Sequence, residues 1–447
     1  MKIKLADHFT YRRLFRFVLP SIAMMIFTSI YGVVDGFFVS NFAGKIEFAA
    51  VNLILPFPMM LGAFGFMIGT GGSALVSITL GEGRKKEANE YFSMLIYVTI
   101  GVGLVLTVLG VIFTRQIAIL LGAEGEMLKH CVTYGRLLLL ALVPFMLQNV
   151  FQSFLVTAEK PTFGLVITLI AGFINMILDY VFIGVLEGGV VGAALATGIS
   201  QLVGGIVPLV YFFIPNKSQL RLVRAKLNMS ALWKTCFNGS SELMTNLSIS
   251  LVNMLHNFQL IRFAGEDGVA AYGVIMYVNF IFIAVFLGYA IGTAPIIGYH
   301  YGAGNKDEMK NVYKKSISFN IVSGIIMCVV AIALSGVLAK LFVGYDANLY
   351  SMTQKGFAIY SIAFLVMGLN IYSSSFFTAL GNGLVSALLS FLRTMLFQVI
   401  AVLVLPIFFE LNGVWFAIVA AEGTTLIVTI VFLLHYRKNM DIKFVLS

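Results

Sequence analysis

The chain has 447 residues, of which 60% are hydrophobic and 11% are charged, and its formal net charge is +9. Charge this sparse excludes a soluble globular protein of the same length. The charged residues cluster between long neutral runs, as in polytopic helical membrane proteins. Only three cysteines are present, which excludes a disulfide framework and a CxxC metal site.

The N-terminal stretch, MKIKLADHFTYRRLFRF, is basic and amphipathic. It lacks the short apolar core and the A-x-A-like cleavage site of a secretory signal peptide. We therefore expect a surface helix on the cytoplasmic side that leads into the first membrane span.

Twelve apolar runs follow, each long enough to cross about 30 Å of hydrocarbon at about 1.5 Å per residue. Several runs are longer than a span requires, so we expect tilted or kinked helices, with a bend at Pro20 in the first one. The expected spans are 17–40, 48–80, 91–114, 130–157, 162–186, 189–213, 236–261, 269–301, 316–339, 356–380, 384–409 and 413–436.

The basic residues indicate how the spans are oriented. With the N-terminus inside, 21 of the 29 Lys and Arg residues fall on the inner side, as the positive-inside rule requires. Twelve spans then place both termini in the cytoplasm. The net charge of +9 is thus a topology signal, and it does not favour a nucleic-acid partner.

An internal repeat divides the chain into halves. Three short matches recur at one sequence offset of 221, and a fourth, GVVGAALA against GVWFAIVA, recurs at an offset of 224. The alternative is that paired glycines after helices are ordinary C-cap signals. The matching segments are 42–44 with 263–265, 80–87 with 301–308, 157–158 with 378–379, and 189–196 with 413–420.

Each half holds six spans, an even number, so the two halves share one orientation. We therefore expect an all-α polytopic membrane protein with 12 transmembrane helices in two six-helix lobes, related by a pseudo-two-fold axis along the membrane normal. The expected lobes are residues 1–214 and 235–447, and the basic stretch 215–234 is the expected cytoplasmic linker. Two lobes around a central cavity are typical of secondary transporters.

Polar residues of three expected spans lie at a similar depth in the first lobe. Asn175 and Asp179 are four residues apart and share a helix face. Asp179, Thr197 and Asp35 each lie about 12–15 Å from the outer end of their spans, at about 1.5 Å per residue. These hard oxygens suit a small cation such as Na⁺, and buried carboxyls equally suit H⁺. The alternative is structural hydrogen bonding between helices, or to the local backbone for Thr197.

The second lobe differs at the corresponding positions. His256 occupies the position equivalent to Asp35, which predicts that cation binding is confined to the first lobe. A structural role is the expectation for Glu242 and Glu422, and Arg393 is expected to pair with backbone carbonyls or an acid. Gln148 and Asn149 line the cavity or bond between helices, and soft Met and aromatic walls suit a promiscuous pocket.

The sequence resembles the multidrug and toxic compound extrusion (MATE) transporters over nearly its whole length. LPSIAMMIFTSIYGVVDGFFVSNFAG is similar to the family's first span, and FINMILDYVFI followed by GVVGAALAT is similar to the fifth and sixth spans of the DinF-like and MepA-like branch. The resemblance implies a MATE/MOP-type fold and a cation site at Asp35, Asn175, Asp179 and Thr197. It also implies pocket contacts at Tyr31 and Asn149.

What the resemblance implies is a bacterial inner-membrane, multi-pass antiporter that expels lipophilic cations in exchange for Na⁺ or H⁺ as its two lobes rock. No enzyme activity, no cofactor besides the coupling ion, and a monomer are expected. A lipid-linked oligosaccharide flippase of the same superfamily is the alternative function. Its phosphate-bearing substrate calls for several basic cavity residues, whereas only Arg393 lies within a span. The five histidines form no HExxH or paired motif of an intramembrane enzyme.

Overall fold

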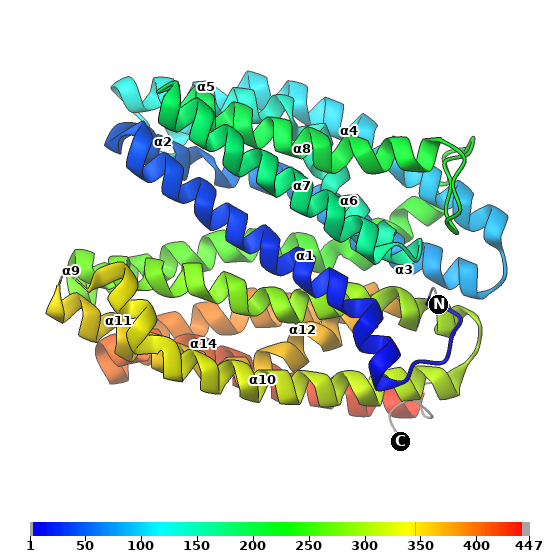
Figure 1. The fold of residues 1–447 in the computed structure, drawn as a ribbon. Coiled ribbons are helices and arrows are strands. Elements are labelled where there is room, and N and C mark those ends of the chain that lie inside the picture. Colours follow the sequence, from blue (N-terminus) through cyan, green and yellow to red (C-terminus); the bar gives the residue numbers. More distant parts are fainter. Residues whose placement is uncertain (1–2, 345, 440–447) are drawn as a thin grey trace.

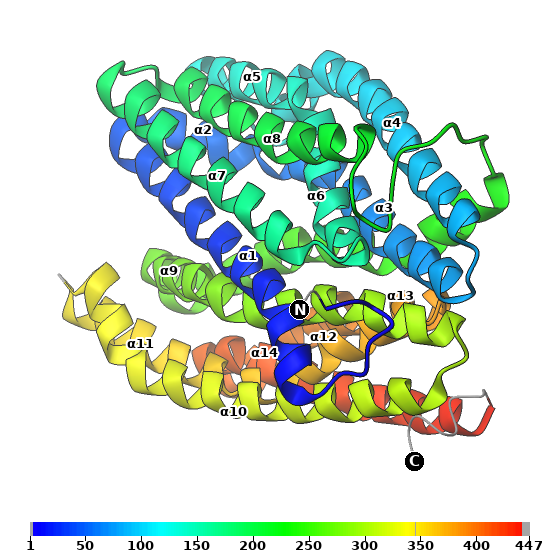
Figure 2. The ribbon, with the colours of Figure 1, turned by 45° about the vertical axis from the view of Figure 1, so that its right-hand side comes forward.

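The computed structural model describes residues 3–344 and 346–439, and within these ranges every regular element is a helix. Figures 1 and 2 show two stacked lobes, with α1–α8 in one lobe and α9–α14 in the other. The elements are α1 (Tyr11–Phe38), η1 (Val39–Ala43), α2 (Lys45–Ile54), α3 (Pro56–Gly81), α4 (Lys85–Leu120), α5 (Gly125–Leu140), α6 (Leu142–Thr157), α7 (Pro161–Asp179), η2 (Tyr180–Val185), α8 (Gly189–Phe213), α9 (Met229–Gly302), α10 (Lys306–Val343), α11 (Ala347–Ser361), α12 (Phe364–Ala379), α13 (Gly383–Phe391), η3 (Leu392–Leu396) and α14 (Phe397–Asn439).

Twelve membrane-crossing segments can be traced in these helices. Among the described residues, eight helices are long and apolar enough to cross a membrane, and two bent pairs raise this number to ten. Non-helical backbone at Gly265 divides α9 into two arms, and non-helical backbone at Glu410 divides α14 in the same way. Both breaks lie where the sequence predicts a connection between spans, so the expected twelve spans are all present.

Proline and asparagine account for many of the helix boundaries and bends. Pro56 begins α3 at its first turn, where the missing N–H costs no hydrogen bond. The α5–α6 pair bends by 54° just before Pro144, as expected for proline inside a span. Asn228 caps α9, because its side chain accepts a hydrogen bond from the Ala231 N–H. Pro20 lies inside α1, which continues as one helix across it.

Two glycine crossings join the lobes and obey the internal repeat. Gly81 of α3 lies against the backbone of Tyr299 in α9, and Gly302 of α9 lies against the backbone of Ile78 in α3. Gly302 and Gly81 are related by the sequence offset of 221, and so are Tyr299 and Ile78. Each contact is therefore the pseudo-two-fold copy of the other. No side chain fits between the two backbones at these crossings.

A second reciprocal pair lies further along the same helices. Gly71 of α3 lies against Gly239 of α9, while Gly292 of α9 lies against Val18 of α1. The offset is again 221 for both partners. Helices α1 and α3 thus pack closely on α9, and the lobes meet near the end of the molecule where the described chain begins at Ile3 and ends at Asn439. We call this end the terminal end.

The N-terminal segment, residues 3–10, is not the surface helix that its amphipathic pattern predicts. The helix begins only at Tyr11, and Leu5 and Phe9 are completely buried. The Leu5 N–H donates to Glu159 Oε1 at 2.9 Å, and the Phe9 N–H donates to Glu308 Oε1 at 2.8 Å. Because these carboxylates belong to different lobes, the segment gives up helical hydrogen bonds to bridge the lobes at the terminal end.

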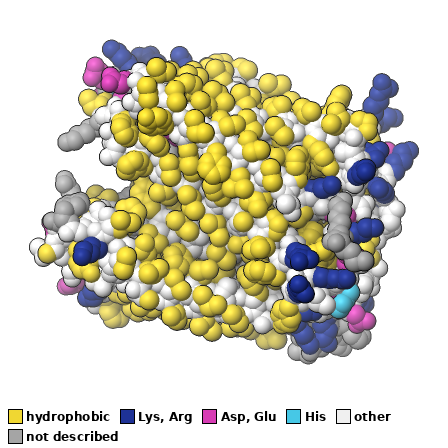
Figure 3. Space-filling model, viewed as in Figure 1, with side chains coloured by type: hydrophobic (Ala, Val, Ile, Leu, Met, Phe, Trp, Pro, Cys, Tyr) yellow, Lys and Arg dark blue, Asp and Glu magenta, His cyan; other side chains and the backbone are white. Residues whose placement is uncertain are grey.

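The surface separates apolar and charged regions. Figure 3 shows a wide apolar belt, with Lys and Arg gathered at the terminal end. The same view shows a notch between the two lobes at the opposite end. The molecule is therefore closed between the lobes at the terminal end and hollowed between them at the other.

Candidate functional site

The predicted cation-binding residues come from three neighbouring helices of the first lobe. Asp35 lies on α1, Asn175 and Asp179 lie on α7, and Thr197 lies on α8. Helix α7 packs against both α1 and α8, which brings the three faces together. Small residues allow this approach, since Gly172 of α7 lies directly against the rings of α1.

Both carboxylates precede a short π-helical segment. Asp179 is the last residue of α7 before η2, and Asp35 lies four residues before η1 begins at Val39. Segments of this kind are rare in proteins overall, and those that do occur are often found at functional sites. The sequence contains no signal for these two segments.

The four side chains meet in the structure. The carboxyl of Asp35 lies next to the side chains of Asp179, Thr197 and Asn175. Asp179 is completely buried, Asn175 is 1% exposed, and Asp35 and Thr197 are half-buried. The geometry expected from equal depth in three spans is therefore present, and the two carboxyls face each other rather than lipid.

Five buried oxygens of this group have no hydrogen-bond partner among the described residues. These atoms are both carboxyl oxygens of Asp179, Oδ1 of Asp35, Oδ1 of Asn175 and Oγ1 of Thr197. Buried polar atoms in folded proteins are almost always paired, because an unpaired one loses its hydration without compensation. No Lys, Arg or His of the described chain pairs with either carboxyl. Two carboxyls that have no basic partner, together with an amide oxygen and a hydroxyl oxygen, are suited to a small cation or a proton.

The chemistry of the donors indicates which cations fit. The group consists of two carboxylates, an amide oxygen and a hydroxyl, all hard ligands that suit Na⁺. No cluster of three or more His, Cys, Asp or Glu side chains occurs in the described residues, so nothing there has the composition of a transition-metal site. The set fits Na⁺ or H⁺.

A pocket of about 160 Å³ adjoins the carboxylates. Asp35, Asn175 and Thr197 form its polar side, and Met59 and Phe145 contribute to its apolar walls. A cavity with apolar walls and a few convergent polar groups is the usual form of a small-molecule site. The remaining lining residues are Tyr31, Gly32, Leu55, Pro58, Tyr134, Leu138, Leu142 and Gln201.

Three residues expected near the cavity have different positions. Tyr31 lines the pocket and lies next to the side chain of Gln148. Gln148 is buried behind it and contacts Gly204 of α8. Asn149 is buried in α6 and is not among the pocket-lining residues, although its side-chain N–H₂ group has no hydrogen-bond partner in the described chain.

Two pocket residues were not predicted. Gln201 is one turn after Thr197 on α8, so the four-residue spacing could have identified it. Tyr134 of α5 is buried beside both Asp35 and Asp179. No sequence pattern links it to them, because only the packing of α5 in the folded lobe brings it there.

In the second lobe the buried polar side chains form hydrogen bonds and an ion pair with one another. Arg393 Nε donates to Glu422 Oε1 at 2.9 Å, and Asn370 donates to Glu422 Oε2 at 2.7 Å. This confirms the expected pairing of Arg393 with an acid. His256 stacks on Tyr272, with ring centroids 5.0 Å apart, and its Nδ1 lies 3.0 Å from the Val252 carbonyl oxygen. Glu242 lies half-buried near Arg393.

Comparisons with known proteins agree with this architecture. The multidrug export protein MepA of Staphylococcus haemolyticus (strain JCSC1435) is 26% identical over 436 residues, covering 96% of this chain and 95% of that protein. MepA of Staphylococcus aureus (strain MSSA476) is 25% identical with the same coverage. A solved outward-facing multidrug resistance MATE family transporter of the MOP superfamily superimposes with a TM-score of 0.90 at 23% identity, covering 95% of each chain.

A crystal structure of MATE in complex with MaL6 also superimposes with a TM-score of 0.90, at 22% identity over 95% of this chain and 96% of that one. These structures confirm the two-lobe, twelve-span fold. The MatE family model matches the chain twice, at residues 20–181 and 243–404, once in each lobe. The chain is therefore a multi-pass membrane protein that belongs to the MatE family.

Proposed function

We propose that this protein is a multidrug efflux antiporter that exports lipophilic cations in exchange for Na⁺ or H⁺. One observation carries the proposal: the carboxyls of Asp35 and Asp179 face each other inside the first lobe without a basic partner in the described chain. Relatives that span almost the whole chain are multidrug export proteins, which supports the substrate class.

The proposed ion site consists of Asp35, Asn175, Asp179 and Thr197. Two neighbouring carboxylates repel each other when both are charged, so this site favours uptake of a positive charge. Ion binding removes this repulsion and draws α1 and α7 together, which changes the shape of the adjoining pocket. A lipophilic cation in the pocket and an ion between the carboxyls thus compete for the same negative charge.

Export then requires only that ion and drug favour opposite states of the two lobes. The notch lies at the end opposite the termini, so the structure corresponds to the outward-facing state in the proposed orientation. The glycine crossings at Gly81 and Gly302 close the cytoplasmic end in this state. Opening toward the cytoplasm separates these crossings and releases the ion inside.

The proposed orientation places both termini in the cytoplasm of a bacterial inner membrane. It is supported by the Lys and Arg residues that gather at the terminal end. We propose lobes at residues 1–214 and 235–447 with a linker at 215–234, and a monomer as the working unit. The alternative of an oligosaccharide flippase loses support, because Arg393 is already paired with Glu422.

Transport by the purified protein in liposomes tests the proposal. Liposomes are loaded with ethidium, and Na⁺ and pH gradients are imposed independently of each other. We expect an inward gradient of one ion to accelerate ethidium efflux well above that of protein-free liposomes. The gradient that accelerates efflux identifies the coupling ion. Efflux that responds to neither gradient contradicts antiport.

A further inference from the structure

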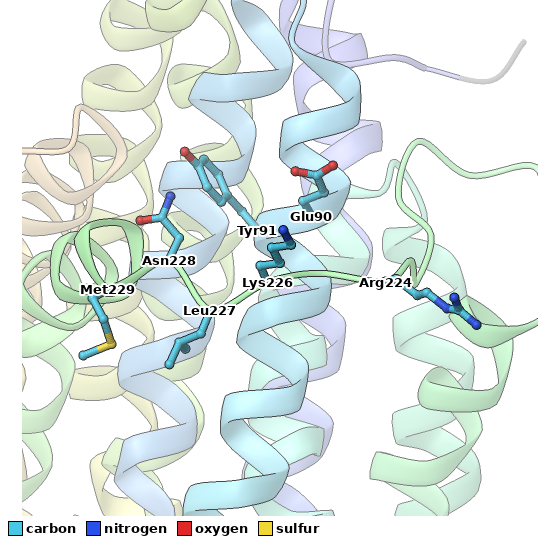
Figure 4. Close-up of a pocket in the computed structure, with 7 residues that line it drawn as sticks. All are labelled: Glu90, Tyr91, Arg224, Lys226, Leu227, Asn228 and Met229. Carbon is cyan, nitrogen blue, oxygen red and sulfur yellow. The ribbon is translucent and has the colours of Figure 1, made fainter.

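A second cavity lies at the terminal end, far from the carboxylates of the first lobe. It measures about 510 Å³ and lies between the start of α4 and the segment that connects the lobes, residues 214–228. Figure 4 shows its lining side chains, which come from both of these elements. They are Glu90, Tyr91, Arg224, Lys226, Leu227, Asn228 and Met229.

Hydrogen bonds to α4 hold the connecting segment in place. The Arg221 N–H donates to Asn89 Oδ1 at 2.6 Å, and the Val223 N–H donates to Ser93 Oγ at 2.8 Å. The Tyr97 hydroxyl donates to the Val223 carbonyl at 3.1 Å. The segment is therefore fixed along one face of α4, and the residues that follow it have defined positions at the cavity.

The cavity is positively charged. Arg224 and Lys226 are exposed, and neither forms an ion pair with an acid of the described chain. Glu90 is the single acidic residue in the lining. An adjoining cavity of about 270 Å³ shares Tyr91 and Asn228 with the first and adds the exposed Lys234, together with Arg84 and Glu82, which pair with each other. The connecting segment itself contains no Asp or Glu.

Exposed apolar side chains lie directly beside this charge. Leu227, at the end of the connecting segment, is 63% exposed, and Met229 and Trp233, in the first turns of α9, are 64% and 73% exposed. In a membrane protein, apolar side chains at the end of a span contact acyl chains, and tryptophan is enriched at the level of the headgroups. A soluble anion can pair with the basic side chains but makes no contact with the apolar ones. A phospholipid can do both, because its phosphate pairs with the basic side chains and its acyl chains contact the apolar side chains.

We propose that this cavity binds the headgroup of an anionic phospholipid from the leaflet at the terminal end. Arg224 and Lys226 contact the phosphate, with Lys234 beside it, and the acyl chains run along Leu227, Met229 and Trp233. A basic cluster next to a membrane span is attracted to an anionic membrane surface. This site does not depend on the nature of the transported ion or drug.

Titration of the purified full-length protein in a neutral detergent tests the assignment. The probes are short-chain phosphatidylglycerol, short-chain phosphatidylcholine, and glycerol 3-phosphate as a headgroup without acyl chains. Binding is measured as the concentration dependence of the rise in melting temperature. We expect phosphatidylglycerol to bind at least tenfold more tightly than either of the other probes.

Three variants separate charge recognition from effects on folding. Arg224→Gln/Lys226→Gln is expected to weaken phosphatidylglycerol binding about 30-fold, at about 1 kcal/mol per basic residue. Glu90→Gln is expected to strengthen it about fivefold. Arg224→Lys/Lys226→Arg keeps both charges and is expected to bind within twofold of the unchanged protein.

The matched control is Arg12→Gln/Arg16→Gln, which removes two exposed charges from the same end of the molecule. We expect it to change binding by less than twofold. Equal losses in this control and in Arg224→Gln/Lys226→Gln overturn the site. Equal binding of phosphatidylcholine excludes recognition of charge, and equal binding of glycerol 3-phosphate replaces the lipid with a soluble anion. No response to phosphatidylglycerol in the unchanged protein also overturns the proposal.

Discussion

The two lobes share one fold but differ in the pairing of their buried polar groups. In the second lobe these groups bond to one another, and in the first lobe several have no partner in the described chain. Asn149 of the first lobe and Asn370 of the second are related by the sequence offset of 221. The side-chain N–H₂ group of Asn149 has no partner in the described chain, whereas that of Asn370 donates to Glu422 at 2.7 Å. Similarly, Asp35 faces a second carboxyl, while its counterpart His256 stacks on a tyrosine ring.

The source of the difference lies in two further positions. Arg393 corresponds to Gly172 at the offset of 221, and Glu422 corresponds to Gly198 at the offset of 224 found in the last span. The second lobe thus carries an ion pair at the two positions where the first lobe has glycines, whose neighbours pack directly against them. Buried charges that form an ion pair neutralise each other within the lobe. Buried carboxyls that have no basic partner can instead bind a cation. The same fold therefore supports one structural lobe and one proposed ion-binding lobe.

The most severe test of this contrast is the change Asp179→Asn, with Asp35→Asn as its companion. We expect ion-driven ethidium efflux to fall to the rate of protein-free liposomes, because the proposed site loses the charge that attracts the ion. Melting temperature should stay the same or rise, since an unpaired buried carboxyl is replaced by a neutral group of the same shape. Efflux and melting curves are measured on the same preparation.

Asp267→Asn, an exposed position between the two arms of α9, makes the same chemical change as a control. Its efflux should match that of the unchanged protein. Full ion-driven efflux by Asp179→Asn would remove the role proposed for the carboxyl pair. The difference between the lobes would then be one of packing alone.

The next largest effect is expected from Glu422→Gln in the second lobe. Glu422 is completely buried and Arg393 is 11% exposed, so the change leaves a buried guanidinium without its counter-charge. Breaking a buried pair from one side costs about 3–5 kcal/mol of the free energy of unfolding. Thermal melting in detergent measures the loss, and efflux per folded molecule is expected to stay within twofold.

The double change Arg393→Met/Glu422→Met serves as the matched control. Because replacing both partners with apolar side chains removes the buried charges together, most of the lost stability should return. Loss of efflux in Glu422→Gln with unchanged melting would place ion coupling in the second lobe as well, and the contrast between the lobes would fail.

At the glycine crossings the lobes are expected to behave alike. Gly81→Ala and Gly302→Ala each place a methyl group against the backbone of the opposite lobe. Overpacking of this kind costs about 1–3 kcal/mol, and the pseudo-two-fold relation predicts similar values for the two changes. Gly273→Ala, a helical position with no atom within 4 Å of the added carbon, is the control.

The added methyl groups at positions 81 and 302 destabilise only the state in which the terminal end is closed, because only there do the two backbones touch. We therefore expect both variants to shift the protein toward the state open at that end. Spin labels placed across the crossing report this shift as a longer distance. A clear shift in only one of the two variants would contradict the symmetry inferred from the repeat.

Much of the fold follows from patterns that the sequence shows directly. Apolar runs predicted all twelve spans, and the constant offset of the internal repeat predicted which glycines are equivalent in the two lobes. The helix breaks at Gly265 and Glu410 also fall in predicted connections. The N-terminal segment was predicted incorrectly, because its backbone hydrogen bonds go to Glu159 and Glu308, far away in the chain. Local patterns do not report such partners.

The site was predictable to the extent that it depends on depth and helical spacing. Equal depth in three spans predicted that Asp35, Asp179 and Thr197 meet. Tyr134 was missed because it reaches the pair only through the packing of α5. Asn149 was expected to line the cavity or to bond between helices, and it is not among the residues that line this pocket.

The smallest expected effect concerns His256, the counterpart of Asp35. His256→Phe keeps an aromatic ring against Tyr272, with which the imidazole now stacks at an interplanar angle of 5°. Such a ring pair contributes about 0.5–1.5 kcal/mol, most of which phenylalanine retains, so the melting temperature should change by only a few degrees. Ion-driven efflux should remain within twofold, because no ion is assigned to this position. His256→Ala, which removes the ring, is expected to lower the melting temperature further at the same efflux per folded molecule. If His256→Phe instead stops efflux while the protein stays folded, this histidine takes part in coupling, and the second lobe is not merely structural at the position where the first carries its carboxylate.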